Sequence, residues 1–352
     1  MKESRALAGA RGARDAAEVL NAGFTSVREL GGDGHDIDKA ITEGYILGPK
    51  IYSSISIISP TAGHADVHTM PLDAVHDACS HGFFFEVADG VPECLKAVRL
   101  QLRKGAKVIK ICTSGGNTSE IDDPLHQQFS DEELKAMVDE ARRADRVVAA
   151  HCHGKAGIMA ALRAGCKTIE HGSYLDDETI AALKSYDAIL VPTRSILQGG
   201  LSMASNWTER SFAKVKITAA AHLESYRKAV SAGVRIASGS DLGPSREGTI
   251  ISHGREGMEL KYAVEVGMTP LQAIEASTAS GPDTLGPQAP LSGQLKDGYD
   301  ADFLALSQSP LDDIEVFTEP KNITHIWKAG RLVKSPEAAQ RWTFPGLTLR
   351  SL

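Results

Sequence analysis

The stretch Val147-Val148-Ala149-Ala150-His151-Cys152-His153-Gly154 is the part of the chain that decides the fold. Its continuous run of small apolar and β-branched residues is typical of a strand that helices cover on both faces. The run ends in two imidazoles and a turn glycine. In barrel enzymes the C-terminal ends of the parallel strands carry the reacting groups, so we expect His151 and His153 to lie at a functional site.

Outward from this strand, short apolar runs alternate with amphipathic segments along the chain. The other strands expected before residue 288 cover residues 24–30, 50–54, 106–111, 168–172, 188–193 and 234–241. The expected helices cover residues 4–21, 38–43, 92–104, 130–144, 157–164, 177–185 and 212–231, and a further helix begins at residue 269. This alternation predicts an α/β fold with a parallel sheet and right-handed crossovers.

The strand count defines the expected domains. Seven strands precede residue 288, whereas a (β/α)8 TIM barrel has eight, and the first expected element is a helix. We therefore expect residues 1–287 to form an N-terminally truncated TIM barrel that lacks its first strand. Over residues 288–352, glycine-punctuated hairpin signals replace the helices. These residues are expected to form the C-terminal part of a small β-sandwich domain.

Composition limits the classes of function. A net charge of −7 without a basic block offers no obvious surface to nucleic acid or to an anionic membrane, so a small molecule is the expected partner. Five cysteines without CxxC spacing favour a reducing compartment over a disulfide framework. No apolar run reaches membrane-spanning length, and the first residues lack the core of a signal peptide. We expect a cytoplasmic protein, with secretion of a longer form left open.

Four residues with useful chemistry stand at or near the ends of predicted strands: Lys110, His151, His171 and Asp241. Barrel strand ends surround one site, so these residues are expected to converge. Two imidazoles and a carboxylate suit a divalent metal such as zinc, which makes hydroxide available near neutral pH. A buried lysine ammonium beside a metal is unfavourable. Lys110 fits if its amine has reacted with carbon dioxide to give a carbamate that bridges two ions.

Each of these residues also has an ordinary structural explanation. A strand-end histidine is more often a hydrogen-bonded polar residue than a ligand, and Lys110 alone suits a lysine with a buried stem and an exposed head. His64 and His153 are equally consistent with a functional and a structural role. Cys152 fits a small apolar filler better than a nucleophile. The metal hypothesis depends on the whole ordered set rather than on any single residue.

Several motifs in this order resemble a known family. They are FTSVRE at 24–29, GAKVIK at 105–110, AHCHGKAG at 150–157, IEH at 169–171 and GSD at 239–241. Together they resemble the amidohydrolase superfamily, and within it the branch of fungal ochratoxinase and the prolidase-like metal-dependent carboxypeptidases. The resemblance covers nearly the whole chain and implies a hydrolase that acts on carbon–nitrogen bonds.

The resemblance also implies roles for particular residues. Lys110 resembles the carboxylated lysine that bridges two metals, and His151 and His171 resemble ligands of the second metal. Asp241 resembles a ligand of the first metal that also acts as general acid and base, so Lys110 and Asp241 are the expected catalytic residues. His153 and His64 are expected on the substrate side of the site. The implied cofactor is one or two divalent metals, with zinc as the expected ion.

One departure from the family pattern concerns the first metal. The family places an HxH pair at the end of the first barrel strand, whereas the H-x-H of this chain, His151 to His153, stands at the fifth-strand position. The first metal site is therefore expected to be incomplete.

The leading hypothesis is a metal-dependent amidohydrolase that cleaves the amide or peptide bond to a C-terminal amino acid, in ochratoxin-like, N-acyl amino acid or dipeptide substrates. One alternative is a catalytically silent truncated paralogue that acts only through assembly. Another is a cyclic-amide hydrolase or deaminase of the same superfamily. The resemblance further implies a homo-oligomer.

Overall fold

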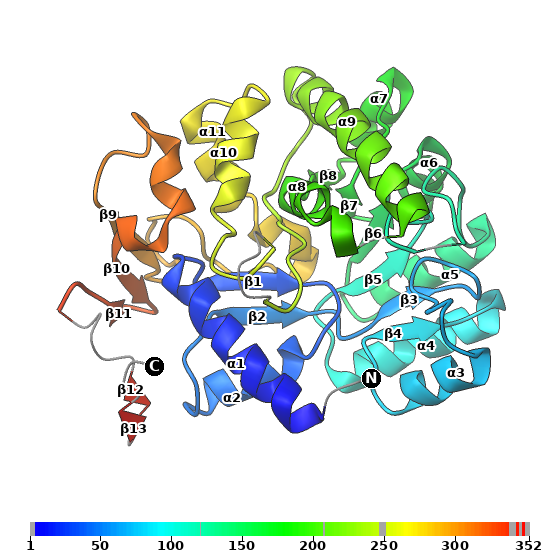
Figure 1. The fold of residues 1–352 in the computed structure, drawn as a ribbon, viewed down its shortest axis with the longest axis horizontal. Helices are drawn as coiled ribbons and strands as arrows, with labels where there is room; N and C mark the ends of the chain where they lie inside the picture. Colours follow the sequence, from blue (N-terminus) through cyan, green and yellow to red (C-terminus); the bar gives the residue numbers. More distant parts are fainter. Residues whose placement is uncertain are drawn as a thin grey trace.

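A computed structural model describes residues 4–119, 121–206, 208–245, 251–337, 343–344 and 347–348. Its centre is a six-stranded parallel sheet in the order β4-β3-β5-β6-β7-β8 (Figure 1). These strands are β3 (Ile57–Ser59), β4 (Phe85–Val87), β5 (Ile109–Cys112), β6 (Val148–Cys152), β7 (Thr168–His171) and β8 (Ile189–Val191). The expected α/β fold, with a mostly parallel sheet, is confirmed.

Two further strands form a separate parallel pair beside this sheet. β1 (Ser26–Glu29) pairs in parallel with β2 (Lys50–Ser53). The backbone N–H of Lys107, just before β5, donates to the carbonyl oxygen of Ser53 at 2.9 Å. At the other end, β8 is bridged by Ile236. In the six-stranded sheet, β5, β6, β7 and β8 are neighbours in chain order, and the bridge to Ile236 follows β8.

Helices surround the sheet and match most of the predicted ranges. They are α1 (Arg5–Asn21), α2 (Gly34–Thr42), α3 (Leu72–Ser80), α4 (Gly90–Lys104), α5 (Asp131–Arg142), α6 (Lys155–Ala164), α7 (Asp177–Ser185), α8 (Arg194–Ser202), α9 (Glu209–Ser231), α10 (Met258–Glu265) and α11 (Pro270–Ser277). The Ser130–Glu133 capping box begins α5, as the sequence predicts. Among the described residues, no helix combines the length and the apolar character needed to cross a membrane.

Some elements differ from the prediction. The strand expected over residues 234–241 is reduced to the bridge between Ile236 and Leu190, because the N–H of Ser238 turns away to donate to Ala276. Ile55, at φ 71°, separates β2 from β3, which the sequence did not reveal. Helices α3, α8 and α10 were also not predicted.

The histidine strand β6 is an inner strand of the six-stranded sheet. All five residues of β6 are buried, which confirms the expected strand with covered faces. Two glycines allow close packing where this strand leads into α6. A Cβ at Gly154 would lie 2.6 Å from the Cα of Leu125, and a Cβ at Gly157 would lie 2.4 Å from the carbonyl oxygen of Thr113. The absence of a side chain at these two glycines therefore lets the loop after β5 approach the start of α6 closely.

A small antiparallel sheet lies beside the barrel strands (Figure 1, left). It consists of β9 (Phe303–Leu306), β10 (Ile323–Lys328) and β11 (Arg331–Lys334), and a separate pair is formed by β12 (Thr343–Phe344) and β13 (Leu347–Thr348). Ile323 and Ile326 pack with Leu20 at the end of α1. These strands all lie in the range predicted for the small β domain, whose boundary at residue 287 stays a prediction.

Candidate metal centre

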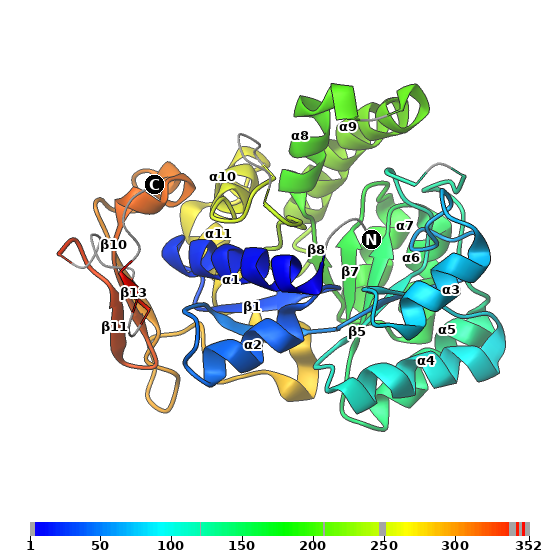
Figure 2. The ribbon, with the colours of Figure 1, turned by 60° about the horizontal axis from the view of Figure 1, so that its bottom comes forward.

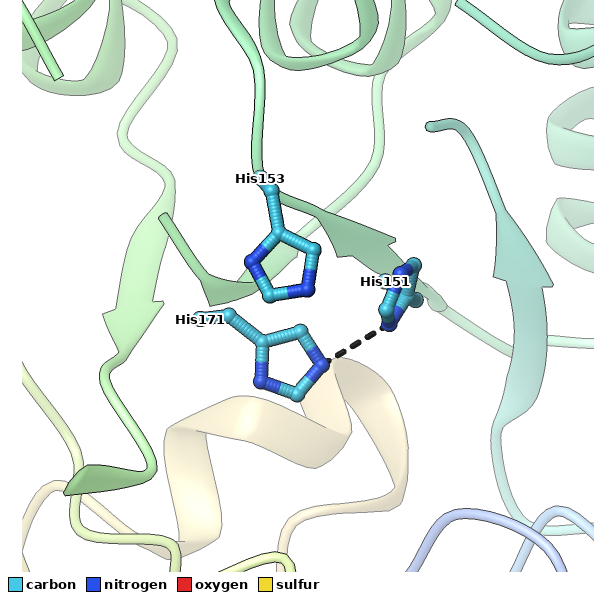
Figure 3. A group of neighbouring side chains, drawn as sticks. All are labelled: His151, His153 and His171. Atoms are coloured by element: carbon cyan, nitrogen blue, oxygen red, sulfur yellow. Dashed lines mark hydrogen bonds between the residues drawn. The ribbon is translucent and has the colours of Figure 1, made fainter. Parts of the chain in front are cut away.

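Three histidines from neighbouring strand ends gather in one buried group (Figure 3). His151 lies in β6, His153 just after it, and His171 ends β7. One ring nitrogen from each lies within 4.8 Å of those of the others, and the three residues are only 5%, 4% and 6% exposed. Adjacent parallel strands bring them together, as their positions in the sequence predict.

The facing nitrogens of His151 and His171 are arranged for a cation. Nδ1 of His151 and Nε2 of His171 share a hydrogen bond at 2.9 Å, the place that a metal between them would take (Figure 3). Burial, followed by the neighbouring imidazoles, holds the pKa of both rings well below the usual histidine value, so both are neutral. Two nitrogen ligands of a tetrahedral zinc ion lie about 3.3 Å apart for Zn–N distances of about 2.0–2.1 Å. The two ring nitrogens would therefore need to move apart by only about 0.4 Å to bind one zinc ion.

The outer nitrogens of the same two rings have oxygen partners. Nε2 of His151 lies 3.3 Å from the carbonyl oxygen of Gly115, and Nδ1 of His171 lies 2.6 Å from Oγ1 of Thr193. A ligating histidine commonly donates its second N–H to an oxygen, which leaves the inner lone pair for the metal. The donor set and its surroundings thus fit a divalent metal held by His151 and His171.

His153 differs from the other two because protein groups occupy both of its ring nitrogens. Its Nδ1 lies 2.8 Å from Oγ of Ser173, and its Nε2 lies 3.2 Å from Nδ2 of Asn117. The ring stacks on His171 with centroids 4.8 Å apart and an interplanar angle of 18°. In this arrangement His153 supports the group without a free lone pair for a metal.

His64 reaches the group from the loop after β3. Its ring stacks on His151 with centroids 4.1 Å apart, and its Nδ1 lies 2.9 Å from Oγ of Ser119. Burial lowers its pKa to about 4, against the opposing charge of Asp122. Gly116 makes room for the ring, since a Cβ there would lie 2.0 Å from His64 Nδ1. His64 therefore covers one face of a candidate ligand.

Lys110 and Asp241 face the same interior. Lys110 is 5% exposed, and burial lowers the pKa of its amine, while the charges of Glu170 and Asp241 oppose that shift. Asp241 as a whole residue is exposed, whereas its carboxyl group is surrounded by protein. This burial raises the pKa of the carboxyl group to about 6, and the charge of Lys110 opposes the shift. Among the described residues, Asp241 does not belong to the close group of ligand atoms that the three histidines form.

Three non-glycine residues at these strand ends adopt a left-handed backbone conformation. His171 has φ 73°, Thr193 has φ 56° and Asp241 has φ 55°. Such conformations cost about 1–3 kcal/mol each and persist where the surroundings enforce them, often at functional sites. The turn at His171 interrupts the strand alternation, so that Glu170 and His171 both contribute to the interior of the barrel.

Several residues of this site were not predicted from the sequence. Thr193 is the last residue of a predicted strand, so its position was a usable signal. Asn117 and Ser173 lie in loops after strands that were recognised, but nothing in their local sequence marks a histidine partner. Glu170 stands out in the sequence only as part of the IEH motif, although it accepts two hydrogen bonds from Arg28, at 3.0 and 2.9 Å.

Comparison with known proteins shows the family to which this sequence is similar. Residues 3–333 match the sequence profile of the amidohydrolase family. Ochratoxinase of Aspergillus niger is 48% identical over 344 residues, which cover 94% of this chain and 70% of that protein.

Solved structures agree with the fold. The crystal structure of A. niger ochratoxinase superposes with a TM-score of 0.89 at 46% identity, over 98% of this chain and 80% of that one. A prolidase in complex with N-methylphosphonate-L-proline gives a TM-score of 0.87 at 31% identity, over 95% and 81% of the two chains. The parallel sheet and its helices therefore match a TIM-barrel architecture.

Proposed function

This chain belongs to the amidohydrolase family, and we propose that it uses divalent metal to cleave the amide or peptide bond that joins an acyl group to a C-terminal amino acid. Hydrolysis of amide or peptide bonds is the chemistry common to its ochratoxinase and prolidase relatives. The observation that carries the metal requirement is the pair of neutral imidazole nitrogens 2.9 Å apart in His151 and His171.

The proposed roles follow from the environment of each side chain. His151 Nδ1 and His171 Nε2 would hold the metal, and Lys110, carboxylated on its amine, would supply a further anionic ligand. A bound divalent metal supplies hydroxide near neutral pH and polarises a carbonyl group. The raised pKa of Asp241, about 6, suits a general base that takes a proton and returns it to the leaving amine.

The substrate class rests on the relatives. Ochratoxinase is the enzyme of A. niger to which this chain is 48% identical, and the prolidase was solved with a phosphonate analogue that carries L-proline. A small amide or dipeptide with a free C-terminal amino acid is therefore the proposed substrate of this chain. His64 and His153 would line its path, zinc is the proposed ion, and we extend the proposal to a cytoplasmic homo-oligomer.

The test compares metal binding and hydrolysis in one preparation. Chelator-stripped protein is titrated with zinc, metal per chain is determined by elemental analysis, and a panel of substrates is assayed. The panel contains an ochratoxin-like amide, an N-acyl-phenylalanine, an Xaa-Pro dipeptide, a cyclic amide and an aminopurine. We expect zinc-dependent release of a C-terminal amino acid and its loss in Asp241→Asn, with the zinc content recorded for both proteins.

Three outcomes would contradict this proposal. Zinc-loaded protein that hydrolyses none of the panel would favour a catalytically silent paralogue. Turnover restricted to the cyclic amide or the aminopurine would assign a different bond within the same family. Unchanged hydrolysis in a folded Asp241→Asn variant would remove Asp241 from the proposed chemistry.

A further inference from the structure

Helix α9 presents a stripe of polar side chains to the loops that carry the candidate metal centre. Lys214, Thr218, His222 and Ser225 are spaced three or four residues apart and so share one helix face. Lys214 and Thr218 contact the loop after β5, His222 contacts the end of β8, and Ser225 contacts the loop after β7. Figure 2 shows α8 and α9 projecting together from the body of the molecule.

Lys214 is the charged member of this stripe. Its Nζ donates to the backbone carbonyl oxygens of Gly116 at 3.0 Å, Ser119 at 2.5 Å and Asp122 at 3.2 Å. The carboxylate of Asp122 lies 3.7 Å away, and the lysine side chain is 16% exposed. An ammonium has three N–H donors, so these carbonyl groups use its full capacity. Lys214 thus gathers a loop around one positive charge.

The loop gathered in this way, residues 114–128 and described except at residue 120, contacts the histidine group. The carbonyl oxygen of Gly115 lies 3.3 Å from Nε2 of His151. The amide Nδ2 of Asn117 lies 3.2 Å from Nε2 of His153. Asn117 is oriented in turn by Thr218, whose hydroxyl donates to its Oδ1 at 2.7 Å.

These contacts decide which ring nitrogen carries the proton. A carbonyl oxygen only accepts, so Gly115 favours a proton on Nε2 of His151 and leaves Nδ1 unprotonated. The amide of Asn117 donates to Nε2 of His153, which favours the proton on Nδ1 of that ring. Both tautomers therefore depend on the position of a loop whose carbonyl groups would otherwise repel one another.

We propose that Lys214 is a positioning residue of the metal centre: its ammonium holds the loop of residues 114–128 so that Gly115 and Asn117 set the tautomers of His151 and His153. This inference deepens the proposed function and rests on it, because it takes Nδ1 of His151 as a metal ligand. Lys214 does not touch that ligand itself and acts through the loop.

The first experiment compares two lysines of the same helix. Lys214→Ala removes the ammonium from the loop, and Lys216→Ala is the matched control, because Lys216 is exposed with its Nζ 5.0 Å from the centroid of the Phe212 ring. Zinc affinity is measured by chelator competition. We expect Lys214→Ala to weaken zinc binding about 10- to 100-fold, the range typical of groups that orient ligands, and Lys216→Ala to leave it unchanged.

Chemical rescue separates this role from a general loss of stability. The atoms lost in Lys214→Ala, Cγ to Nζ, correspond to n-propylammonium, which can donate to the same three carbonyl groups. We expect n-propylammonium to restore zinc affinity, and tetramethylammonium, which has no N–H, to be without effect. Should Lys214→Ala not fold, Lys214→Gln provides the same comparison with a neutral donor.

A spectroscopic readout on metal-free protein completes the test. Nitrogen-15 spectra of labelled histidines should show single tautomers for His151 and His153 in the wild type and a mixture in Lys214→Ala. Unchanged spectra and unchanged zinc affinity in a folded variant would overturn the inference. A wild type that binds no zinc would overturn the proposed function instead, while the metal-free spectra would still decide the role of Lys214.

Discussion

The buried ion pair between Arg28 and Glu170 predicts a measurable loss of thermal stability when Arg28 is replaced. Arg28 in β1 donates to both carboxylate oxygens of Glu170 in β7, and its other terminal nitrogen donates to Thr168 at 3.0 Å. The side chains of Arg28 and Glu170 are only 11% and 3% exposed, so the ion pair is buried. It links β1 and β7, two strands that do not pair with each other. Arg28→Met would leave the buried carboxylate of Glu170 without its hydrogen-bonded counter-ion.

The size of the effect follows from burial. Removal of one partner of a buried ion pair costs about 3–5 kcal/mol, mostly because the remaining charge is uncompensated. With an unfolding entropy of about 2.1 cal/mol/K per residue, a chain of 352 residues loses about 1.4 °C in Tm per kcal/mol. Arg28→Met should therefore lower Tm by about 4–7 °C.

A double-mutant cycle tests this reasoning by calorimetry. Arg28→Met/Glu170→Gln removes both charges and keeps a polar group for Thr168, so its Tm should lie closer to the wild type than that of Arg28→Met. Because the two residues are in direct contact, the cycle should give a measurable coupling free energy. If the double variant is as unstable as the sum of the two single variants, Arg28 and Glu170 are not coupled and the uncompensated charge is not the cause.

The remaining predictions concern packing, pH and ligand orientation. Gly157→Ala should destabilise the chain by about 1–3 kcal/mol, because the new Cβ would lie 2.4 Å from the carbonyl oxygen of Thr113; an unchanged Tm would contradict the close approach. Burial raises the pKa of Glu259 from 4.5 to about 7. Between these pH values the folded state therefore binds more protons than the unfolded state. The free energy of unfolding should fall as pH rises from about 4.5 to about 7. Glu259→Gln should flatten that pH dependence in denaturant titrations, and an equally steep profile in the variant would assign it to other groups. Thr193→Val removes the hydroxyl 2.6 Å from His171 Nδ1 and should weaken zinc binding about 10- to 100-fold, whereas Thr193→Ser should retain it; equal affinities in the two variants would show that the hydroxyl does not orient the ring.

The strand ends could be located from the sequence because their signal is local. The buried run before His151 and the capping boxes are patterns within a few residues, and strands that follow one another in the chain, as β5 to β8 do, are commonly neighbours in a parallel sheet. Convergence of His151, His153 and His171 therefore follows from the positions of these residues in the chain. The short strands β3 and β4 were not predicted, although β8 is equally short, because only β8 stands within a longer apolar run in the sequence.

Partners of the histidines escaped prediction for a different reason. Asn117 and Thr218 are separated by 101 positions, and their contact depends on where α9 comes to rest over the loop after β5. Local propensity contains no such information. The left-handed conformations of His171, Thr193 and Asp241 were equally hidden, since the sequence shows no glycine at those positions.

The division between predicted and unpredicted residues has a physical meaning for this site. Groups that could meet a metal stand on strands, whose ends the barrel brings together whatever the loops do. Groups that orient them, such as Asn117, Thr193 and Lys214, stand on loops and on helices outside the sheet, where each contact depends on the others. Substitutions at the strand ends should therefore abolish metal binding, whereas substitutions in the orienting groups should grade it. Variants of Lys214, Thr218 and Asn117 should therefore each weaken zinc binding by a different amount. Because the three residues act through one loop, their losses in binding free energy should not add up in combined variants.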